Sequence, residues 1–236
     1  MKQPEFSLFL PLTAPVTVAH VSDLHDRSPK TVLAALEALS PDLIALTGDL
    51  FHRLDTARYA LPFLRAAAGI APTVYSLGNH EWLEEGDRER ITACGAILLD
   101  NESVRVGELT VGGLSSGFGR QKQGNLKATP APDRAFLARF AAEEGVRLLL
   151  CHHPEYYPEF IRPLPIHLTL SGHAHGGQWR IGRQGIFAPG QGLFPRYTGG
   201  LYDGGRLEVS RGLSNTAPVP RLFNPTELPV LRLLPA

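Results

Sequence analysis

The sequence contains little cysteine and methionine: its 236 residues include two cysteines and one methionine. Cys94 and Cys151 are too few for a disulfide framework, and they lack the spacing of a zinc site. A disulfide-stabilised secreted domain is therefore excluded. The cysteine content predicts a reduced setting and a cytoplasmic location.

An excess of either charge is also absent, since 23 lysines and arginines balance 23 aspartates and glutamates. Non-specific binding to nucleic acid, or to an anionic membrane surface, requires an excess of basic residues. The composition therefore predicts no specific nucleic-acid patch, and it gives no indication of an oligomeric state.

Long hydrophobic runs are absent as well, because no run approaches the roughly 18 apolar residues of a membrane-spanning helix. The first 25 residues resemble a secretory signal, but Pro11 and Pro15 interrupt the apolar stretch. Cleavage near Ala14 or Ala19 would cut the strand that leads to Asp23. We therefore expect no membrane anchor in this chain. We also expect a single domain over residues 1–236, because no linker is evident.

The sequence does contain five short apolar runs that each end in residues able to bind a metal ion. Their length, their Val, Leu and Ile content and the Gly or Pro residues that bound them predict buried strands. The runs are VTVAHVSDLH (16–25), LIALTGDL (43–50), TVYSLGNHEW (73–82), VRLLLCHHPE (146–155) and HLTLSGHAHGG (167–177).

Helical patterns separate these runs at residues 28–40, 56–69 and 131–145. We expect Ser28 to cap the first helix, Pro62 to start or kink the second, and Asp133 to lie near the start of the third. Strands that alternate with helices predict an α/β fold, in which ligands bind beyond the carboxyl ends of the strands. The metal-binding residues fall at those ends.

After Asn101 the pattern changes from alternating strands and helices to hairpins. Residues 102–116 predict two strands joined by a glycine-containing turn, and residues 185–190, 205–213 and 228–235 repeat this signal. Residues 116–130 are glycine-rich and without periodicity, which predicts a surface loop.

The residues at the strand ends offer imidazole nitrogens and carboxylate or amide oxygens. This donor set suits manganese, iron, zinc or nickel, and the lack of clustered cysteine argues against structural zinc. Six or seven such groups exceed the needs of one ion, whereas two ions about 4 Å apart and bridged by a carboxylate would use them all. Taken singly, each residue is compatible with a structural role, and we assign that role to His20, His52 and His167. For His52, which follows Asp49 closely in the sequence, a position facing the cleft is the alternative.

The five blocks together resemble the signature of the calcineurin-like metallophosphoesterase superfamily. In chain order the blocks are Asp23-x-His25, Gly48-Asp49, Gly78-Asn79-His80-Glu81, His152-x-Pro154 and Gly172-His173-x-His175. The resemblance implies a four-layer α/β/β/α sandwich, in which two mixed sheets are flanked by helices, with a dinuclear metal centre.

The resemblance also implies a role for each matching residue. The implied ligands are Asp23, His25 and His175 for one ion and Asn79, His152 and His173 for the other, with Asp49 as the bridge. His80 would contact the scissile phosphate without binding metal, and we expect either Glu81 or Asp26 to lie beside it and hold its proton. His152 is preferred to His153 because the family's ligand stands two residues before proline. Manganese is the first choice of metal, with iron, zinc or nickel as alternatives.

The tail resembles that of stand-alone bacterial phosphoesterases, many of which carry an N-terminal anchor or export signal. The stretches that carry this resemblance are GHAHGGQWR, PRYTGGLYDGGRLEVSRGL and RLFNPTELPVLRL. No such anchor is recognisable here, which favours a small, water-soluble phosphate ester as substrate. Asp26 and Arg27 stand where that pattern commonly has glycine. We expect Trp82 and Trp179 to be packing residues.

The predicted activity is hydrolysis of a phosphate ester by a hydroxide that bridges the two ions and attacks phosphorus in line. A phosphodiester is favoured because no dedicated cation for a terminal dianion is evident, although Arg120, with Lys122, is a candidate substrate-binding residue. The alternatives are a phosphomonoesterase of the same fold and a catalytically silent metal-binding scaffold for protein partners. Redox chemistry of the purple-acid-phosphatase type is disfavoured, since Leu50-Phe51-His52 offers no tyrosine ligand.

Overall fold

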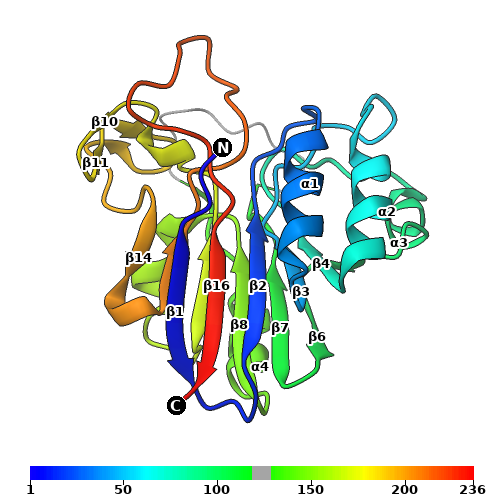
Figure 1. Cartoon of the computed structure of the whole chain (residues 1–236). Coiled ribbons are helices and arrows are strands. Elements are labelled where there is room, and N and C mark those ends of the chain that lie inside the picture. Colours follow the sequence, from blue (N-terminus) through cyan, green and yellow to red (C-terminus); the bar gives the residue numbers. More distant parts are fainter. Residues whose placement is uncertain (119–128) are drawn as a thin grey trace.

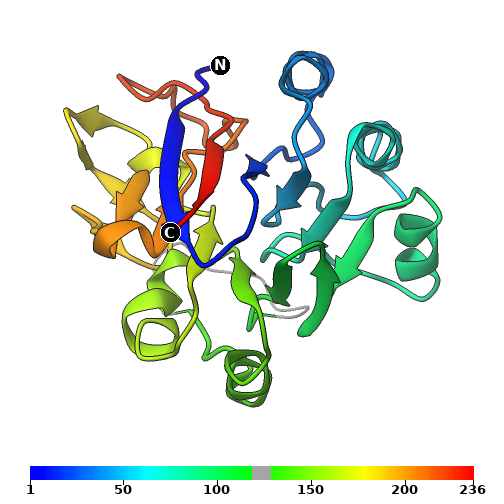
Figure 2. The same cartoon turned by 60° about the horizontal axis from the view of Figure 1, so that its bottom comes forward.

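Two six-stranded sheets lie face to face at the centre of the molecule (Figures 1 and 2). The structure is a computed structural model, and it describes residues 1–118 and 129–236. The first sheet has the order β1 (Glu5–Leu10), β16 (Val230–Pro235), β2 (Val16–Val21), β3 (Leu43–Leu46), β4 (Thr73–Ser76) and β5 (Ile97–Leu99). The second has the order β14 (Gly200–Tyr202), β15 (Leu207–Val209), β9 (Leu168–Ser171), β8 (Val146–Cys151), β7 (Leu109–Leu114) and β6 (Glu102–Val106).

Helices cover the outer face of each sheet. The first sheet packs against α1 (Lys30–Leu39), α2 (Ala60–Ile70) and α3 (Asp87–Thr92), while α4 (Arg134–Ala141) lies on the second. Figure 2 shows α1 in blue and α2 in cyan on one side and α4 in green on the other. The predicted four-layer α/β/β/α sandwich of two mixed sheets is therefore confirmed.

Strand β3 shows why the strands read as continuous apolar runs. Its side chains alternate between two cores: Ile44 and Leu46 pack towards the helices, and Leu43 and Ala45 pack between the sheets. A strand that is buried on both faces has no polar side to expose, so its sequence cannot alternate.

The C-terminal strand β16 corrects one prediction. Residues 228–235 read as part of a hairpin, but β16 pairs in parallel with β1 and antiparallel with β2, so it joins the first sheet beside the N-terminus. Figure 1 shows this red strand between two blue ones. The pairing is between opposite ends of the chain, and local sequence patterns carry no information about such a partner. The segment Glu5–Leu10, which resembled part of a signal, is the edge strand β1.

The other hairpin predictions are confirmed. Strands β6 and β7 pair antiparallel around Gly107, β14 pairs antiparallel with β15, and β12 (Phe187–Ala188) pairs antiparallel with β13 (Gly192–Leu193). Between β9 and β12 the chain forms another short antiparallel pair, β10 (Arg180–Ile181) with β11 (Gln184–Gly185).

The helix starts follow the sequence in two of three cases. The Asp133 carboxylate accepts a hydrogen bond from the Phe136 amide and caps α4, and α2 begins at Ala60 with Pro62 in its first turn. The predicted Ser28 cap is wrong, because α1 begins at Lys30 and Pro29 occupies the cap position without a side-chain bond. Ser28 lies one residue too far from the helix to serve.

Asp26 has a structural role that the sequence did not indicate. Its carboxylate accepts hydrogen bonds from the amides of Arg58 (2.8 Å), Tyr59 (2.6 Å) and Ala60 (3.2 Å) at the start of α2. A negative charge at a helix N-terminus satisfies amides that have no partner within the helix. This bond network accounts for an aspartate where glycine is common.

Within the described residues, none of the helices combines the length and apolar character needed to cross a membrane.

Candidate metal centre

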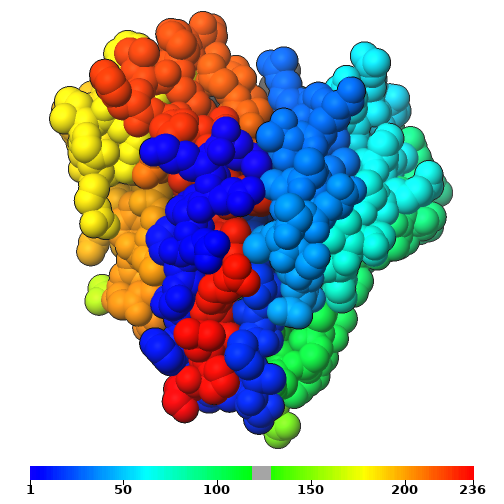
Figure 3. Space-filling model, viewed as in Figure 1, coloured from blue at the N-terminus to red at the C-terminus, as the bar shows by residue number. Residues whose placement is uncertain are grey.

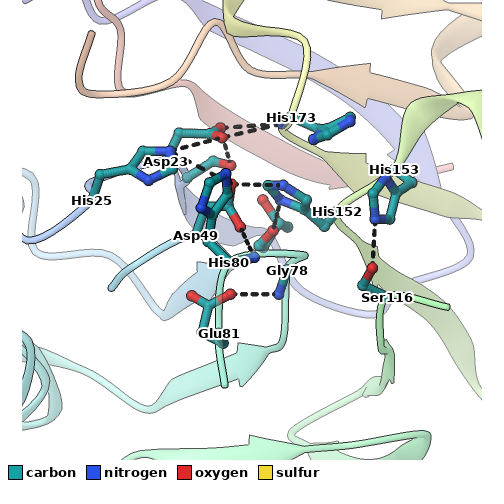
Figure 4. A network of polar contacts seen from close by, with 12 residues as sticks. Asp23, His25, Asp49, Gly78, His80, Glu81, Ser116, His152, His153 and His173 are labelled. Carbon is teal, nitrogen blue, oxygen red and sulfur yellow. Dashed lines mark hydrogen bonds and ion pairs between the residues drawn. The ribbon is translucent and has the colours of Figure 1, made fainter. Parts of the chain in front are cut away.

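Asp49 is at the centre of the candidate site, in the loop that follows β3 (Figure 4). Its Oδ2 atom lies 3.2 Å from Nε2 of His152, 3.5 Å from Nε2 of His25 and 3.8 Å from Nε2 of His80. These histidines come from the loops after β8, β2 and β4. The carboxyl ends of three strands from both sheets therefore meet at one carboxylate.

Asp23 organises the neighbouring part of the site. Its Oδ1 atom lies 3.4 Å from Nε2 of His175 and 3.9 Å from Nε2 of His25. Its carboxylate also accepts hydrogen bonds from the His173 amide and, at 2.6 Å, from the Ser22 hydroxyl. Asp23 thus holds the turn that carries both His173 and His175.

Two overlapping groups of potential ligand atoms result, each with its atoms within 4.8 Å of one another. Asp49 belongs to both. The groups are Asp23, His25, Asp49 and His175, and Asp49, His152 and His173. Asn79 is 5% exposed and lines the same cavity as Asp49 and His173. The structure therefore brings together all seven residues that the resemblance implied as ligands.

Several polar atoms of this site are buried without a hydrogen-bond partner among the described residues. They are Nδ1 and Nε2 of His25, Oδ1 of Asn79 and Nε2 of His152. A buried polar group without a partner costs about 1–3 kcal/mol, so folded proteins rarely leave several together. Nitrogen and oxygen donors that converge in this way fit divalent metal ions.

The protonation states of His25, His173 and His175 suit metal binding. Burial lowers the pKa of His25 to about 3, although the Asp49 carboxylate acts in the opposite direction. Burial, together with the neighbouring His153, lowers the pKa of His173, and burial also lowers that of His175. Neutral imidazoles keep a lone pair for a metal ion.

His152 is oriented by the backbone. Its Nδ1 donates a hydrogen bond to the Thr47 carbonyl at 2.7 Å, which leaves Nε2 facing Asp49. The nitrogen that bonds to the carbonyl carries a proton, so Nε2 is the nitrogen that can coordinate. Burial disfavours a charged imidazole here, but Asp49 outweighs burial and raises the pKa of His152 to about 10, so a metal ion at Nε2 would displace a second proton. This geometry favours His152 over His153 as a ligand.

The backbone of the site is strained. Asp23, His25, Asp49, His173 and His175 all have positive φ, between 46° and 64°. Such conformations cost non-glycine residues energy and cluster at functional sites. A Cβ atom on Gly172 would lie 1.8 Å from Oγ of Ser22, so only glycine permits the close approach of this turn to the loop after β2.

Glu81 supports the loops from beneath. Its carboxylate accepts hydrogen bonds from the Leu50 amide (2.5 Å), the Tyr75 hydroxyl (2.7 Å) and the Gly78 amide (2.8 Å). These bonds tie the residue after Asp49 to the loop that carries Asn79 and His80. Neither Glu81 nor Asp26 contacts His80, so the expectation that one of them holds its proton is wrong: both carboxylates are engaged by backbone amides.

His80 lies at the edge of the cluster and faces the cavity. Its side chain is 39% exposed, its amide donates to Oδ1 of Asp49 at 3.0 Å, and its Nδ1 lies 2.8 Å from Nδ1 of His52. His52 therefore contacts the predicted catalytic residue, and the structural role assigned to it is wrong. His52 stands only three residues after Asp49, the implied bridging ligand, and this short spacing was the available signal.

Two residues near the ligands were missed. Glu155 contacts Nδ1 of His153 at 3.1 Å and Nε2 of His173 at 3.7 Å. Arg221, from a distant segment, lies 3.2 Å from Nδ1 of His175. Glu155 follows the His152 block closely enough to have been considered, whereas no sequence signal connects Arg221 with the site.

His153 is buried and bonds to the Ser116 hydroxyl at 2.8 Å. The candidate substrate-binding residue Arg120, like Lys122, lies outside the described residues.

A cavity of about 870 Å³ opens above the cluster, and Asp49, Asn79 and His80 are among its lining residues. Trp82 and Trp179 also line it, so their assignment as packing residues alone is wrong. The site thus combines a buried group of metal-ligand donors with a space large enough for a substrate.

Residues 16–177 match the family of calcineurin-like phosphoesterases. This range contains every strand-end loop that carries an implied metal ligand. The chain belongs to this family. Its members are metallophosphoesterases, which places the protein in the class of phosphoester hydrolases with divalent metal ions.

Curated relatives are similar over most of the chain. An uncharacterized metallophosphoesterase, YkuE of Bacillus subtilis, is 28% identical, with 91% of this chain and 76% of that protein covered. The phosphodiesterase YaeI of Escherichia coli is 29% identical, with coverage of 86% and 76%. The uncharacterized metallophosphoesterase Cj0846 of Campylobacter jejuni is also 29% identical over 89% of this chain, which spans only 55% of that protein. Among solved structures, the phosphopantetheinyl hydrolase PptH of Mycobacterium tuberculosis aligns at 19% identity and a TM-score of 0.46, covering 84% of this chain and 89% of that one.

Proposed function

We propose that the protein hydrolyses phosphodiesters with two divalent ions held by the residues around Asp49. One observation carries the proposal: the loops after four strands bring six aspartate and histidine side chains into two groups that share Asp49, and Asn79 from the loop after β4 lines the same cavity. Four buried atoms of these residues lack a hydrogen-bond partner among the described residues. When bound, two such ions supply a hydroxide nucleophile at neutral pH and neutralise charge on the phosphoryl oxygens.

The chain's own residues have separate roles in this proposal. The ligands are Asp23, His25 and His175 for one ion and Asn79, His152 and His173 for the other, with Asp49 shared. Manganese is the proposed metal, because imidazole and carboxylate ligands without thiolate suit it. His80 belongs to neither group that contains Asp49, although it forms a further group of potential ligand atoms with His25 and His52. It faces the cavity, so we place it against a phosphoryl oxygen or the leaving oxygen of the substrate.

The preference for a diester rests on the charges around the cavity. Among the described residues that line it, Arg53 is the only lysine or arginine. Its guanidinium group lies 2.9 Å from Glu84 and 3.4 Å from Asp55, so its charge is already paired. Among the described residues that line the cavity, a monoester dianion would find no unpaired lysine or arginine, whereas a diester monoanion needs none.

The experiment is to reconstitute the purified protein with manganese, measure its metal content and compare two aryl esters. We expect about two ions per chain and a larger kcat/KM for bis(p-nitrophenyl) phosphate than for p-nitrophenyl phosphate at neutral pH. A larger value for the monoester would reject the diester preference. Less than one ion per chain would reject the dinuclear centre.

A further inference from the structure

The cavity above the metal-ligand cluster is lined by two kinds of residue. The polar lining groups include Asp49, Asn79 and His173 of the cluster. The apolar lining residues include Trp82, Trp179, Ile186, Phe187, Pro218 and Val219. A substrate that fills this cavity therefore has an apolar group next to its phosphate.

We call these apolar residues the apolar wall, and all of them except Trp82 belong to a unit that we call the cap, made of residues 178–196 and 214–223. Several hydrogen bonds join these segments: for example, the Trp179 indole donates to the Pro220 carbonyl at 2.9 Å, and the Arg180 amide donates to the Leu222 carbonyl at 3.1 Å. In Figure 1 the cap lies at the upper left, in yellow and orange-red, beyond the upper ends of the strands.

The outer surface of the cap is also apolar. Seven of the nine exposed large hydrophobic side chains of the described chain lie in the cap. The most exposed are Phe223 (88%), Ile181 (76%), Leu193 (70%) and Phe194 (66%). Figure 3 shows this part of the surface as yellow and orange-red spheres at the upper left. An exposed apolar patch of this kind marks a surface that binds a lipid or a protein.

The backbone conformation draws further attention to two of these residues. Phe194 has a φ of 49° and Phe223 a φ of 54°, a region that L-residues with bulky side chains seldom adopt. Both strained positions present a phenylalanine ring to solvent. Strained backbone positions cluster at functional sites such as ligand clamps, so these two residues are candidates for a contact with a ligand or a surface.

The charge of the cap differs from that of the whole chain. No aspartate or glutamate occurs from Gly172 to Tyr202 or from Val209 to Thr226, although the chain as a whole is neutral. Arg183 and Arg196 are exposed in the first of these stretches. Overall neutrality therefore conceals a basic, apolar surface at one end of the molecule, which complements an anionic lipid surface.

We propose that the substrate is an amphiphilic phosphodiester held in an anionic lipid surface, on which the cap lies. The phosphate reaches the metal-ligand cluster, and the apolar chain of the substrate lies along the wall of Trp82, Trp179 and Val219. In the reaction an oxygen–phosphorus bond forms from water, the bond to one ester oxygen breaks, and that oxygen leaves as an alcohol with a proton from water. A protein partner would account for the exposed patch but not for the apolar wall inside the cavity.

This inference rests on the proposed function and replaces the expectation of a water-soluble substrate. The sequence favoured a water-soluble substrate because no N-terminal anchor is recognisable in it, and the neutral net charge gave no sign of the cap's local excess of basic residues. Two residues, Trp82 and Trp179, are the only tryptophans of the sequence, and both line the cavity. Intrinsic tryptophan fluorescence therefore reports occupation of the apolar wall directly, without any measurement of activity.

The first experiment titrates the manganese-loaded protein with dodecyl phosphate, below its micellar concentration, and with ethyl phosphate. We expect a saturable fluorescence change at least about 100-fold tighter for dodecyl phosphate, because burial of only four methylenes is worth about that factor. Val219→Asp should weaken dodecyl phosphate binding at least about 10-fold, whereas Val219→Ile should not. Equal affinity for the two phosphates would overturn the inference.

The second experiment measures co-sedimentation with vesicles of phosphatidylcholine, with and without 30% phosphatidylglycerol. We expect binding to the anionic vesicles, a loss of binding in Phe194→Ser/Phe223→Ser, and about fivefold weaker binding for each of Arg183→Ala and Arg196→Ala. Phe9→Ser is the matched control: Phe9 is 69% exposed, but it is next to the last residue of β1, whose end lies opposite the cap in Figure 1.

The outcomes separate this inference from the proposed function. If bis(p-nitrophenyl) phosphate is not hydrolysed, the proposed function fails. If it is hydrolysed but neither vesicle composition binds the protein, the lipid surface is rejected and the hydrolase stands. Equal loss of vesicle binding in Phe9→Ser and Phe194→Ser/Phe223→Ser would also reject the role of the cap, and two bound ions in each variant would show that the site is intact.

Discussion

Histidine and carboxylate side chains are buried together in two regions of this molecule, and the two regions treat them differently. Between the sheets, His20 uses both ring nitrogens: Nδ1 contacts the Glu208 carboxylate, and Nε2 lies 2.7 Å from the Thr47 hydroxyl. At the strand ends, neither nitrogen of His25 has a hydrogen-bond partner. The same residue type is thus structural where the chain satisfies it and available to a ligand where the chain does not.

The two regions are neighbours, which makes the comparison testable. Thr47 belongs to both, because its hydroxyl contacts His20 while its carbonyl accepts from His152. A change on one side of Thr47 should alter metal binding, and a change on the other should alter stability. The predictions below separate these effects, from the largest to the smallest.

The largest effect is expected from Asp49→Asn, which keeps the size of the side chain but removes the charge shared by both groups of ligands. We expect the metal content to fall to one ion per chain or fewer and kcat/KM to fall on the order of 10,000-fold or more, because both ions act on the reacting phosphate. Elemental analysis and diester kinetics measure the two effects. Two ions and unchanged kinetics in this variant would refute the bridging role.

His80→Ala should separate contact with substrate from metal binding. We expect both ions to remain while kcat for an alkyl ester falls by about 100- to 10,000-fold, which is the usual range for loss of a general acid. Nitrophenyl esters should lose less, because their leaving oxygens need little protonation. Equal losses for both esters would instead indicate that His80 stabilises the phosphoryl oxygens. His173→Ala, by comparison, should lose an ion together with activity.

His20→Ala should affect stability rather than metal content. The substitution leaves the Glu208 carboxylate buried between the sheets without its partner, which typically costs about 3–5 kcal/mol of the free energy of unfolding. Urea denaturation measures this cost, and the folded variant should still bind two ions. His20→Leu combined with Glu208→Leu is the control, and it should recover most of the loss. If His20→Ala were as stable as the parent protein and the double leucine variant were unstable, the His20–Glu208 pair would not have the structural role assigned to it.

The smallest effect is expected from Glu81→Gln, because Glu81 acts on the ligands through the backbone. An amide can accept at one atom only, so the bonds to Leu50 and Gly78 cannot both survive. We expect activity to fall about 10- to 100-fold, as for other groups that orient metal ligands. Glu102→Gln is the control and should leave activity unchanged, because Glu102 is exposed and its ion pair with Arg88 lies at the surface. A Glu81 variant as active as the Glu102 variant would remove Glu81 from the support of the site.

The sequence predicted the metal-binding side of this comparison well. Asp23, Asp49, Asn79 and the histidines near them each follow a strand, and strands in an α/β fold direct their carboxyl ends to one edge. Local order therefore sufficed to place them together. Arg221 could not be found in the same way, because it reaches His175 from the second segment of the cap, 46 positions further along the chain.

The structural side was predicted less completely. His20 was correctly assigned a structural role, but nothing in the sequence identified Glu208, which is 188 positions away, as its partner. The C-terminal strand was misplaced for the same reason, since the partner of β16 is the N-terminal strand β1. Pairings of this kind are decided by which surfaces are buried together.

The sequence by itself determined the alternation of strands and helices, the family, and the strand ends at which the proposed metal ligands stand. These features depend on short patterns of apolar residues, glycines and residues able to bind metal. Only the tertiary structure decided which buried histidines are satisfied and which are left without partners. It also decided that two segments without acidic residues, 178–196 and 214–223, come together as an apolar cap over the site. Hydrogen-bond satisfaction and surface charge are properties of neighbours in space, and a linear sequence does not list those neighbours.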